Sequence, residues 1–519
     1  MEAWDAVVVG AGIGGLVAAR DLAAGGLRVL VVEQRATPGG SVGQHEVAGL
    51  TLDSGAESFA TRGGAVAALA DELGLGARVV APDPWGAWVQ LASGAGPLPR
   101  TGLLGIPADP WSRDVRRTIG LVGALRAALD RVLPARVGTG AGAGTGTSAA
   151  TLGSLVRARM GRRVLDRLVR PVVAGVHAAD PDDLAVDAVS PGLLAALAAN
   201  GSLGAAVGHL RALAPAGAAV AGLDGGIHVL VDALVADLAE RGVPVRTGAR
   251  VTAVLRVDAD PEGAAPAAFE VTLSPVPDDG PTGSAITASA ATGAETQPAV
   301  VVRTNRLVLA TPEAAGLLTA VVPGLGDLHP DRGADVVLVT LVLDAPVLDA
   351  APRGTGVLVA RDVDRVRAKA LTHATAKWAW LARDAGPGRH VVRLSYGVAG
   401  SPVAGAAPDG TQPADARTLG DDALAALALR DASTLLGVAL SPAQVVASAR
   451  VAWSQALPRP SAAHSATVAR VRAGVAGAGG LAVCGAWVAG NGLASVVPDA
   501  RRAADALLHE HRTGAQSAR

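Results

Sequence analysis

The spacing of apolar residues changes period within the first 33 residues of the chain. Residues 5–9 (DAVVV) and 28–33 (RVLVVE) form two short apolar runs. Between them, from Leu16 to Leu22, apolar residues recur at helical spacing. Short apolar runs next to glycines are typical of buried parallel strands. The chain is therefore predicted to open with a βαβ unit.

Helical and strand-like segments alternate along the rest of the chain. Helical patterns occupy residues 63–77, 114–133, 151–170, 192–213, 222–242 and 421–437. Strand-like runs occupy residues 243–258, 269–273, 299–312, 335–343, 356–360 and 391–397, and residues 481–508 predict a strand, a Gly-rich turn and a helix. Two segments rich in small and polar residues interrupt this pattern. We expect 137–150 to be a flexible linker and 274–298 to be an exposed hairpin excursion.

Composition limits the classes of function. The chain has 519 residues, which favours two or three lobes over one core. Its formal charge of −1 gives no basic field for nucleic acid or an anionic membrane. The single cysteine, Cys484, excludes an internal disulfide and indicates a reducing, cytoplasmic compartment. Glu2 and Asp5 lie where a signal peptide would be basic and then apolar, so no leader is expected.

One uncharged stretch, residues 473–498, is long enough to cross a bilayer. It contains seven glycines and Asn491, a composition that disfavours a membrane span. We therefore predict a buried strand, a turn and the start of a helix in this stretch, and no transmembrane segment.

The strongest chemical signal is the segment Gly10-Ala11-Gly12-Ile13-Gly14-Gly15, between the first strand and the first helix. Gly10 permits a tight turn, Gly12 lets the backbone approach a pyrophosphate, and Gly15 allows the helix to pack closely on the strand. Free N–H groups at the helix N-terminus attract the anion. Glu33 ends the second strand, where an acidic side chain can bind both ribose hydroxyls. Together these features predict a dinucleotide site.

Later glycine motifs favour FAD over NAD. Gly39-Gly40 follows Glu33, and residues 53–58 (DSGAES) come soon after. This arrangement resembles the second glycine pair of amine-oxidase-like flavoproteins. Those proteins carry arginines around the pair, where this chain has Thr37 and Ser41, so Arg35 is a candidate replacement. Residues 484–507 repeat the strand–glycine–helix form, and a helix starting near Ala494 would direct its dipole at the flavin.

Several further motifs resemble those of the porphyrinogen oxidases, a family that spans protoporphyrinogen oxidase and coproporphyrinogen III oxidase. The motifs, in family order, are LPRTGLLGIPAD (98–109), RPVVAGVHAADPDDLAVDAVSP (170–191), TGVLVARD (355–362), ATAKWAW (374–380), VVRLSYG (391–397) and VAWSQALPRPSAAH (451–464). The last lacks the family's usual tyrosine and has Pro460 near that place. The specificity of the resemblance comes from this order, which runs from about residue 5 to 508.

The resemblance implies an α/β fold with three parts: a Rossmann-like FAD-binding domain in three sequence pieces, a mixed-sheet substrate domain and an inserted α-helical domain. The expected pieces are 1–62, 222–312 and 446–512 for FAD, 63–98 and 313–445 for substrate, and 99–221 for the helical domain. The residues expected to hold FAD are Gly10, Gly12, Ile13, Gly14, Gly15, Glu33, Gly39, Gly40, Ala56, Glu57, Ser58, Val251, Trp453, Gly485, Ser495 and Val496. Arg100, Arg393 and Trp378 are the expected substrate contacts, the two arginines because a planar fork suits carboxylates.

The expected activity is oxygen-dependent, FAD-mediated oxidation of a porphyrinogen, with coproporphyrinogen III as substrate and hydrogen peroxide as co-product. Transient contact with a heme-pathway chelatase is a further expectation. Protoporphyrinogen IX is the alternative substrate, and an amine oxidase or carotenoid-desaturase relative is a second reading. A binding protein on a degraded flavoprotein scaffold is a third, which the intact glycines and Glu33 oppose.

No protein side chain is assigned as a catalytic acid or base, because the chemistry is carried by the flavin. No metal site is expected. Asp180, Asp182 and Asp183 could suggest a metal, but a solvated cluster at a helix start explains them better.

Overall fold

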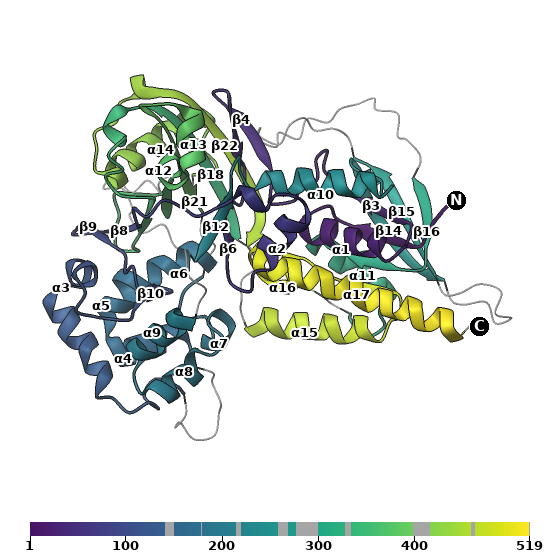
Figure 1. The fold of residues 1–519 in the computed structure, drawn as a ribbon, viewed down its shortest axis with the longest axis horizontal. Coiled ribbons are helices and arrows are strands. Elements are labelled where there is room, and N and C mark those ends of the chain that lie inside the picture. The colour runs from purple at the N-terminus through teal and green to yellow at the C-terminus, as the bar shows by residue number, and fades with distance from the viewer. Residues whose placement is uncertain are drawn as a thin grey trace.

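The computed structural model describes residues 1–140, 150–177, 179–213, 219–257, 268–276, 299–326, 328, 334–397, 416–457 and 462–517. Most of the predicted linker (141–149) and of the predicted hairpin excursion (277–298) lies outside these ranges. Figure 1 shows three lobes: a dinucleotide lobe that holds both termini, a sheet lobe and a helical lobe. Within the described ranges no single helix is long and apolar enough to cross a membrane; only a pair of helices bent by 116° passes that test together.

The dinucleotide lobe is built on a five-stranded parallel sheet. In sheet order its strands are β13 (Val245–Arg246), β3 (Val29–Val32), β2 (Ala6–Val9), β17 (Leu307–Leu309) and β23 (Leu481–Val483). Three distant pieces of sequence supply these strands, which confirms the predicted three-piece Rossmann-like fold. Apart from the edge strand β13, which contains Arg246, the strands are apolar and buried, as expected where helices and a second sheet cover both faces.

One face of this sheet carries α1 (Ile13–Ala24), α2 (Ala65–Glu72), α10 (His228–Glu240) and α17 (Leu493–Ser517). The other face carries α11 (Ala315–Val321), α15 (Ala462–Ala476) and a four-stranded sheet. That sheet has the order β1 (Glu2–Trp4), β16 (Val300–Thr304), β15 (Ala268–Pro275) and β14 (Ala249–Val257). Residues 473–498 form the end of α15, then β23, α16 (Ala486–Ala489) and the start of α17, as predicted for the uncharged stretch.

The sheet lobe contains seven strands. Their order is β22 (Val445–Leu457), β18 (Ala334–Asp344), β21 (Arg389–Tyr396), β20 (Ala370–His373), β19 (Gly356–Val359), β8 (Trp88–Leu91) and β9 (Gly94–Pro97). All neighbours are antiparallel except β19 and β8, so the sheet is mixed. Helix α14 (Asp421–Leu436) seals one face, and α12 (Ala374–Lys377) and α13 (Ala379–Ala385) follow β20.

The helical lobe packs around its own core. Its elements are α3 (Arg113–Ala128), η2 (Leu129–Arg131), α4 (Leu152–Met160), α5 (Arg162–Val164), η3 (Leu165–Val169), α6 (Arg170–His177), α7 (Val186–Val189), α8 (Leu193–Asn200), α9 (Leu203–Leu213) and the β10–β11 pair (Gly102–Leu103, Ile106–Pro107). Arg159 is fully buried there and pairs with the Asp130 carboxylate at 2.5 Å. Its guanidinium also donates to the carbonyls of Pro134 and Gly201, so its charge is fully engaged.

The remaining elements are short. They are β4 (Gln44–Val47), β5 (Leu50–Asp53), β6 (Phe59–Ala60), β7 (Val79–Val80), β12 (Val220–Leu223), η1 (Gly76–Arg78), η4 (Pro312–Ala314), η5 (Pro346–Leu348) and η6 (Pro442–Gln444). Strand β12, which follows the helical lobe in the sequence, pairs with both β6 and β7, which precede that lobe.

Two expected domain pieces begin inside a different lobe. The piece 446–512 begins within β22, which pairs with β18 in the seven-stranded sheet. The piece 313–445 begins just before α11, which packs in the dinucleotide lobe. An apolar strand or helix suits either lobe equally well, so the local pattern did not reveal its partner.

Candidate functional site

The turn between β2 and α1 leaves an open space in front of the helix. A Cβ atom added at Gly12 would meet no protein atom within 4 Å, and the backbone φ of −68° would accept a side chain. No side chain caps this helix, and its first turn has no acidic residue. The N–H groups that begin α1, at Ile13 and Gly14, are therefore available to an anion.

Two other glycine turns converge on this loop. Gly39 donates its N–H to the Ala11 carbonyl at 2.7 Å, and a methyl group on Gly40 would lie 3.2 Å from Gly12 Cα. From the C-terminal piece, a methyl group on Gly14 would lie 2.9 Å from Gly485 Cα and 3.2 Å from Val496. Glycine is required at Gly14 because any side chain would collide with this backbone. The three predicted glycine motifs thus form one cradle.

Glu33 lies at the edge of the cradle, where the sequence places it. Its carboxylate is buried and accepts the N–H of Ala11 at 2.7 Å and of Arg35 at 2.9 Å. Its own carbonyl accepts the Ala249 N–H at the start of β14, which brings Val251 close to the same edge. Open space, free N–H groups and a buried carboxylate at the second strand end fit the pyrophosphate and ribose of a dinucleotide.

Residues 53–58 (DSGAES) contact both the second glycine pair and the start of α10. The Ala56 N–H donates to Ser41, one residue past the second glycine pair, at 3.1 Å. The Asp53 carboxylate accepts the N–H groups of Ile227 and His228, at 3.0 Å each, and so caps the start of α10. The motif therefore has a structural role as well as its expected place beside the cofactor.

Trp453 and Arg35 meet beside the same segment. Trp453 donates its indole N–H to the Ser54 carbonyl at 3.0 Å, and the Arg35 guanidinium lies 5.2 Å from the Trp453 ring centre. Arg35 also donates to the Gly40 carbonyl at 3.2 Å. This geometry keeps Arg35 a candidate for the arginine that relatives carry next to the glycine pair.

Glu57 forms a buried ion triad with two cations from the sheet lobe. Its carboxylate lies 2.6 Å from Lys377 Nζ and 3.0 Å from the Arg393 guanidinium, which also donates to the Asp53 carbonyl at 3.1 Å. Burial alone would raise the pKa of Glu57, but attraction to Lys377 and Arg393 outweighs it and holds that pKa at about 2. The triad therefore carries one net positive charge at the junction of two lobes.

The sheet face that meets the triad is only partly covered. Thr340, paired with Arg393, lines a cavity of about 30 Å³ together with Glu57 and Trp378. That volume holds roughly one water molecule. Further along the same face Leu338, Ser395, Ala370 and Leu358 are half-buried, whereas their neighbours on the α14 side are buried. A half-covered face in mid-sheet, next to the cradle, is where a substrate could lie.

The expected substrate residues do not gather in one place. Arg393 and Trp378 share the small cavity, with Trp378 packed against Gly222 and under Lys377. Arg100 is exposed between β9 and β10, and its backbone N–H donates to Asp114. At the cofactor end, Ser495 accepts a hydrogen bond of 3.4 Å from Arg62, and Ser58 is half-buried next to Glu57. Sequence reasoning did not assign Lys377 a role, because its partner lies 320 positions away.

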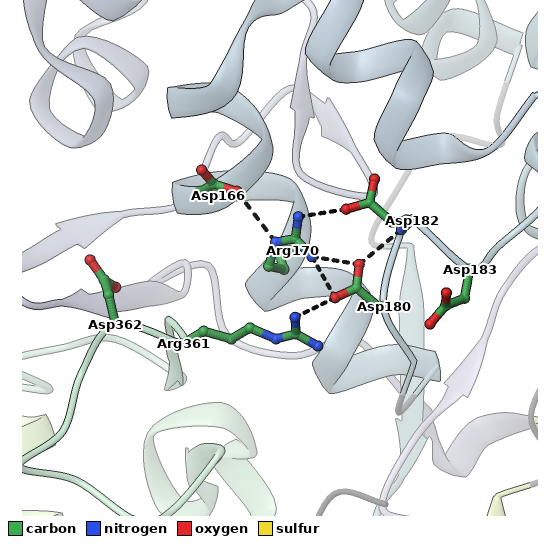
Figure 2. Close-up of a pocket in the computed structure, with 7 residues that line it drawn as sticks. All are labelled: Asp166, Arg170, Asp180, Asp182, Asp183, Arg361 and Asp362. Carbon is green, nitrogen blue, oxygen red and sulfur yellow. Dashed lines mark hydrogen bonds and ion pairs between the residues drawn. The ribbon is translucent and has the colours of Figure 1, made fainter. Parts of the chain in front are cut away.

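Two of the three aspartates considered for a metal, Asp180 and Asp182, form ion pairs instead (Figure 2). Arg170 is central: it contacts Asp166 at 3.3 Å, Asp182 at 2.9 Å and Asp180. Arg361, just after β19, reaches the same Asp180 from the sheet lobe at 2.5 Å, whereas Asp183 and Asp362 point away. Among the described residues no group of His, Cys, Asp and Glu is arranged to hold a metal ion. This cluster ties the helical lobe to the sheet lobe.

The family model for flavin containing amine oxidoreductases matches residues 13–278, just over half of the chain. The chain belongs to this family, and FAD is the dinucleotide that its cradle fits.

The full-length relatives of this chain are named coproporphyrinogen III oxidases. It is 29% identical to the coproporphyrinogen III oxidase of Mycobacterium leprae, covering 97% of this chain and 98% of the relative. It is 28% identical to the enzyme of the same name from Mycobacterium tuberculosis, covering 96% of each.

Solved structures agree on the fold. A candidate protoporphyrinogen oxidase from Exiguobacterium sp. 255-15 superposes with a TM-score of 0.72 at 22% identity, covering 98% of this chain and 99% of the other. A putrescine oxidase superposes with a TM-score of 0.60 at 15% identity, covering 98% and 99%.

Proposed function

We propose that this protein oxidises coproporphyrinogen III to coproporphyrin III. Each two-electron step removes a hydride from a meso carbon and one proton, and three steps give the porphyrin. Three O₂ molecules accept the six electrons and six protons as three H₂O₂. FAD, when bound, supplies the two-electron acceptor that oxygen then reoxidises. The observation that carries the proposal is the similarity over almost the whole length to coproporphyrinogen III oxidases.

The residues of this chain supply binding, orientation and charge. The N–H groups at Ile13 and Gly14, with Glu33, would hold the dinucleotide, and Trp453 and residues 53–58 line the path toward the sheet lobe. The half-covered sheet face around Leu338 and Ser395 would receive the macrocycle. Arg100 remains a candidate partner for a propionate because its side chain is exposed.

Protoporphyrinogen IX is the second candidate substrate, because a structural neighbour with the same fold is named for it. The deciding experiment supplies purified enzyme with each porphyrinogen under air and follows porphyrin fluorescence and H₂O₂. We expect faster turnover of coproporphyrinogen III and one H₂O₂ for each electron pair. Faster turnover of protoporphyrinogen would reverse the choice of substrate, and turnover of neither would reject the proposal.

We extend the proposal to the compartment of the protein and to the partner that receives its product. The buried single thiol of Cys484 suits the cytoplasm, where the product could pass to a chelatase. Product transfer would be tested by adding a chelatase and measuring whether free porphyrin fails to accumulate.

A further inference from the structure

Trp88, the first residue of β8, is contacted by an arginine from each of two lobes. The Arg353 guanidinium lies 4.8 Å from the centre of its ring, and the Arg117 guanidinium lies 5.1 Å from it. Arg353 comes from the turn between η5 and β19 in the sheet lobe, whereas Arg117 belongs to α3 in the helical lobe. Helix α3 packs against β9 here, where the two lobes meet (Figure 1). Two like charges from separate parts of the chain therefore meet on one indole ring.

The two guanidinium groups lack a counter-charge. Within the described part of the chain, neither is hydrogen-bonded or ion-paired to a protein group. Burial lowers the pKa of Arg353 and repulsion by Arg117 lowers it further, and no carboxylate of the described residues offsets either effect. By contrast Arg361, which also joins these two lobes, pairs with the Asp180 carboxylate. An uncompensated pair of like charges destabilises the folded chain, and a bound anion would remove that cost.

The turn that carries Arg353 is strained and fixed by hydrogen bonds. Ala351 has a positive φ of 44°, a conformation that costs energy for a residue other than glycine. Thr355 donates its N–H and its hydroxyl to the Gly86 carbonyl, at 2.8 and 3.0 Å, which ties this turn to the chain just before Trp88. Backbone strain that surrounding contacts maintain is common at ligand-binding sites. The arginine and the indole are therefore in position before a ligand binds.

The arginine pair lies apart from the proposed substrate face. Trp88 pairs with Val357, which is buried under α14, whereas the next residue, Leu358, is half-buried on the other face of the sheet. The C-terminal end of α14 gives an ordinary reason for one cation, because Arg353 packs against the glycine just past its last turn. That reason does not account for Arg117.

We propose that Arg117 and Arg353 form a binding site for a soluble, multiply charged oxyanion, such as phosphate or a small dicarboxylate. Attraction to the indole ring holds each guanidinium in place without using its N–H donors. Those donors match the paired oxygens of a phosphate or carboxylate. Arg117 is exposed, so a ligand can reach the site from solvent, and one that contacts both arginines would tie the helical lobe to the sheet lobe. The inference is independent of the proposed reaction.

The test measures anion binding to the full-length holoenzyme by isothermal titration calorimetry and by melting temperature. The holoenzyme is used because FAD then fills the cradle, which would itself attract phosphate. Sodium phosphate and sodium succinate are titrated separately, with sodium chloride at matched ionic strength as the reference. We expect at least one of the two probes to bind with a dissociation constant on the order of 1 mM and to raise the melting temperature above that in chloride. The tighter probe identifies the chemical class of the ligand.

Variants of the two arginines separate specific binding from general attraction. Arg117→Gln and Arg353→Gln should each weaken binding about tenfold, because each removes one bidentate partner. Arg353→Lys keeps the charge but loses the planar fork, so it should weaken binding less. In chloride alone Arg117→Gln should melt no lower than the wild type, since it relieves the repulsion. The matched control is Arg116→Gln, which removes the same charge from the neighbouring exposed position of α3.

Three outcomes would overturn the proposal, with flavin content verifying that each variant is folded. The first is absence of binding by both probes, and the second is an equal loss of binding in Arg116→Gln and Arg117→Gln. The third is a lower melting temperature of Arg117→Gln in chloride, because stacking on Trp88 would then explain the pair.

Discussion

Glu57 and Lys377, 320 positions apart in the sequence, form a hydrogen-bonded ion pair of 2.6 Å that joins the cofactor segment to the sheet lobe. Each side chain is only 13–15% exposed, so neither is well solvated. Loss of one partner would leave a poorly compensated charge, which costs more than loss of a surface pair.

Lys377→Met should lower the free energy of unfolding at pH 7 on the order of 2 kcal/mol. The pKa of Glu57 is about 2 in the folded protein, below the ordinary 4.5, so its contribution is fully present above pH 4.5 and is lost as pH falls toward 2. The gap between wild type and variant should therefore narrow between pH 4.5 and pH 2. Urea unfolding of both proteins at several pH values measures this difference in the free energy of unfolding. Glu2→Gln, which breaks the exposed pair with Arg246, is the control and should cost less than about 1 kcal/mol.

Gly12→Val should yield folded protein without flavin. The added Cβ atom meets no protein atom within 4 Å, so we expect the apoprotein to melt like wild-type apoprotein, while valine fills the space for the pyrophosphate. Absorbance of the purified protein and thermal melting are the two measurements. Gly316→Val in α11, where an added Cβ atom also meets no protein atom within 4 Å, is the control and should retain FAD. A Gly12→Val protein with stoichiometric FAD would show that the cofactor lies elsewhere.

Glu33→Ala should reduce FAD affinity about ten- to a hundredfold, since hydrogen bonds to a charged acceptor are worth roughly 1.5–3 kcal/mol. It should also destabilise the apoprotein, because the N–H groups of Ala11 and Arg35 lose their acceptor. Flavin titration of the apoprotein gives the affinity. Turnover at saturating FAD should change little, and a collapse of turnover at unchanged affinity would contradict the ribose role.

Arg393 offers two roles that kinetics can separate. As a carboxylate clamp it would favour coproporphyrinogen, which has four propionates, so Arg393→Lys would narrow the preference over protoporphyrinogen. The structure gives its guanidinium internal partners, Glu57 and the Asp53 carbonyl. We therefore expect Arg393→Lys to lower kcat/KM for both substrates by similar factors. A changed ratio of the two kcat/KM values would instead support the role of Arg393 as a carboxylate clamp.

Lys369→Met should stabilise the protein. Burial lowers the pKa of Lys369 to about 8, from an ordinary 10.5, so its charged form is disfavoured in the folded state. The gain should be on the order of 2–3 kcal/mol at pH 7. Between pH 8 and 10.5 Lys369 is protonated in the unfolded wild type but deprotonated in the folded one, so the stability of the wild type rises with pH. The stability gained by Lys369→Met therefore shrinks over this range. Thermal melting across that range tests the sign, and a gain that grows with pH would contradict it.

The sequence was most informative where chemistry restricts residue type within a short segment. Gly12, Glu33 and the strand before each could be predicted because a pyrophosphate needs bare backbone and a ribose needs a carboxylate at a strand end. Gly485 was expected from the resemblance of residues 484–507 to amine-oxidase-like flavoproteins, and the structure places it against Gly14.

Long-range partners could not be predicted from local pattern. Nothing in the segment ATAKWAW indicates that Lys377 faces Glu57, and nothing in β22 indicates that it pairs with β18. The apolar spacing of residues 114–133 predicted a helix, but it did not reveal that Leu121 and Leu125 face outward. A helix with two apolar sides gives the same pattern whichever side is buried.

The contact between Gly14 and Gly485 has a consequence for biogenesis. The first glycine turn is synthesised long before the backbone around Gly485 that completes its surroundings. FAD can therefore be captured firmly only after translation has passed residue 485. A ribosome that stops short of this point releases a chain that contains the whole GxGxxG motif but lacks the backbone that packs against it. We therefore expect flavin to be retained by chains that extend past Gly485 and to be lost from chains that stop before it.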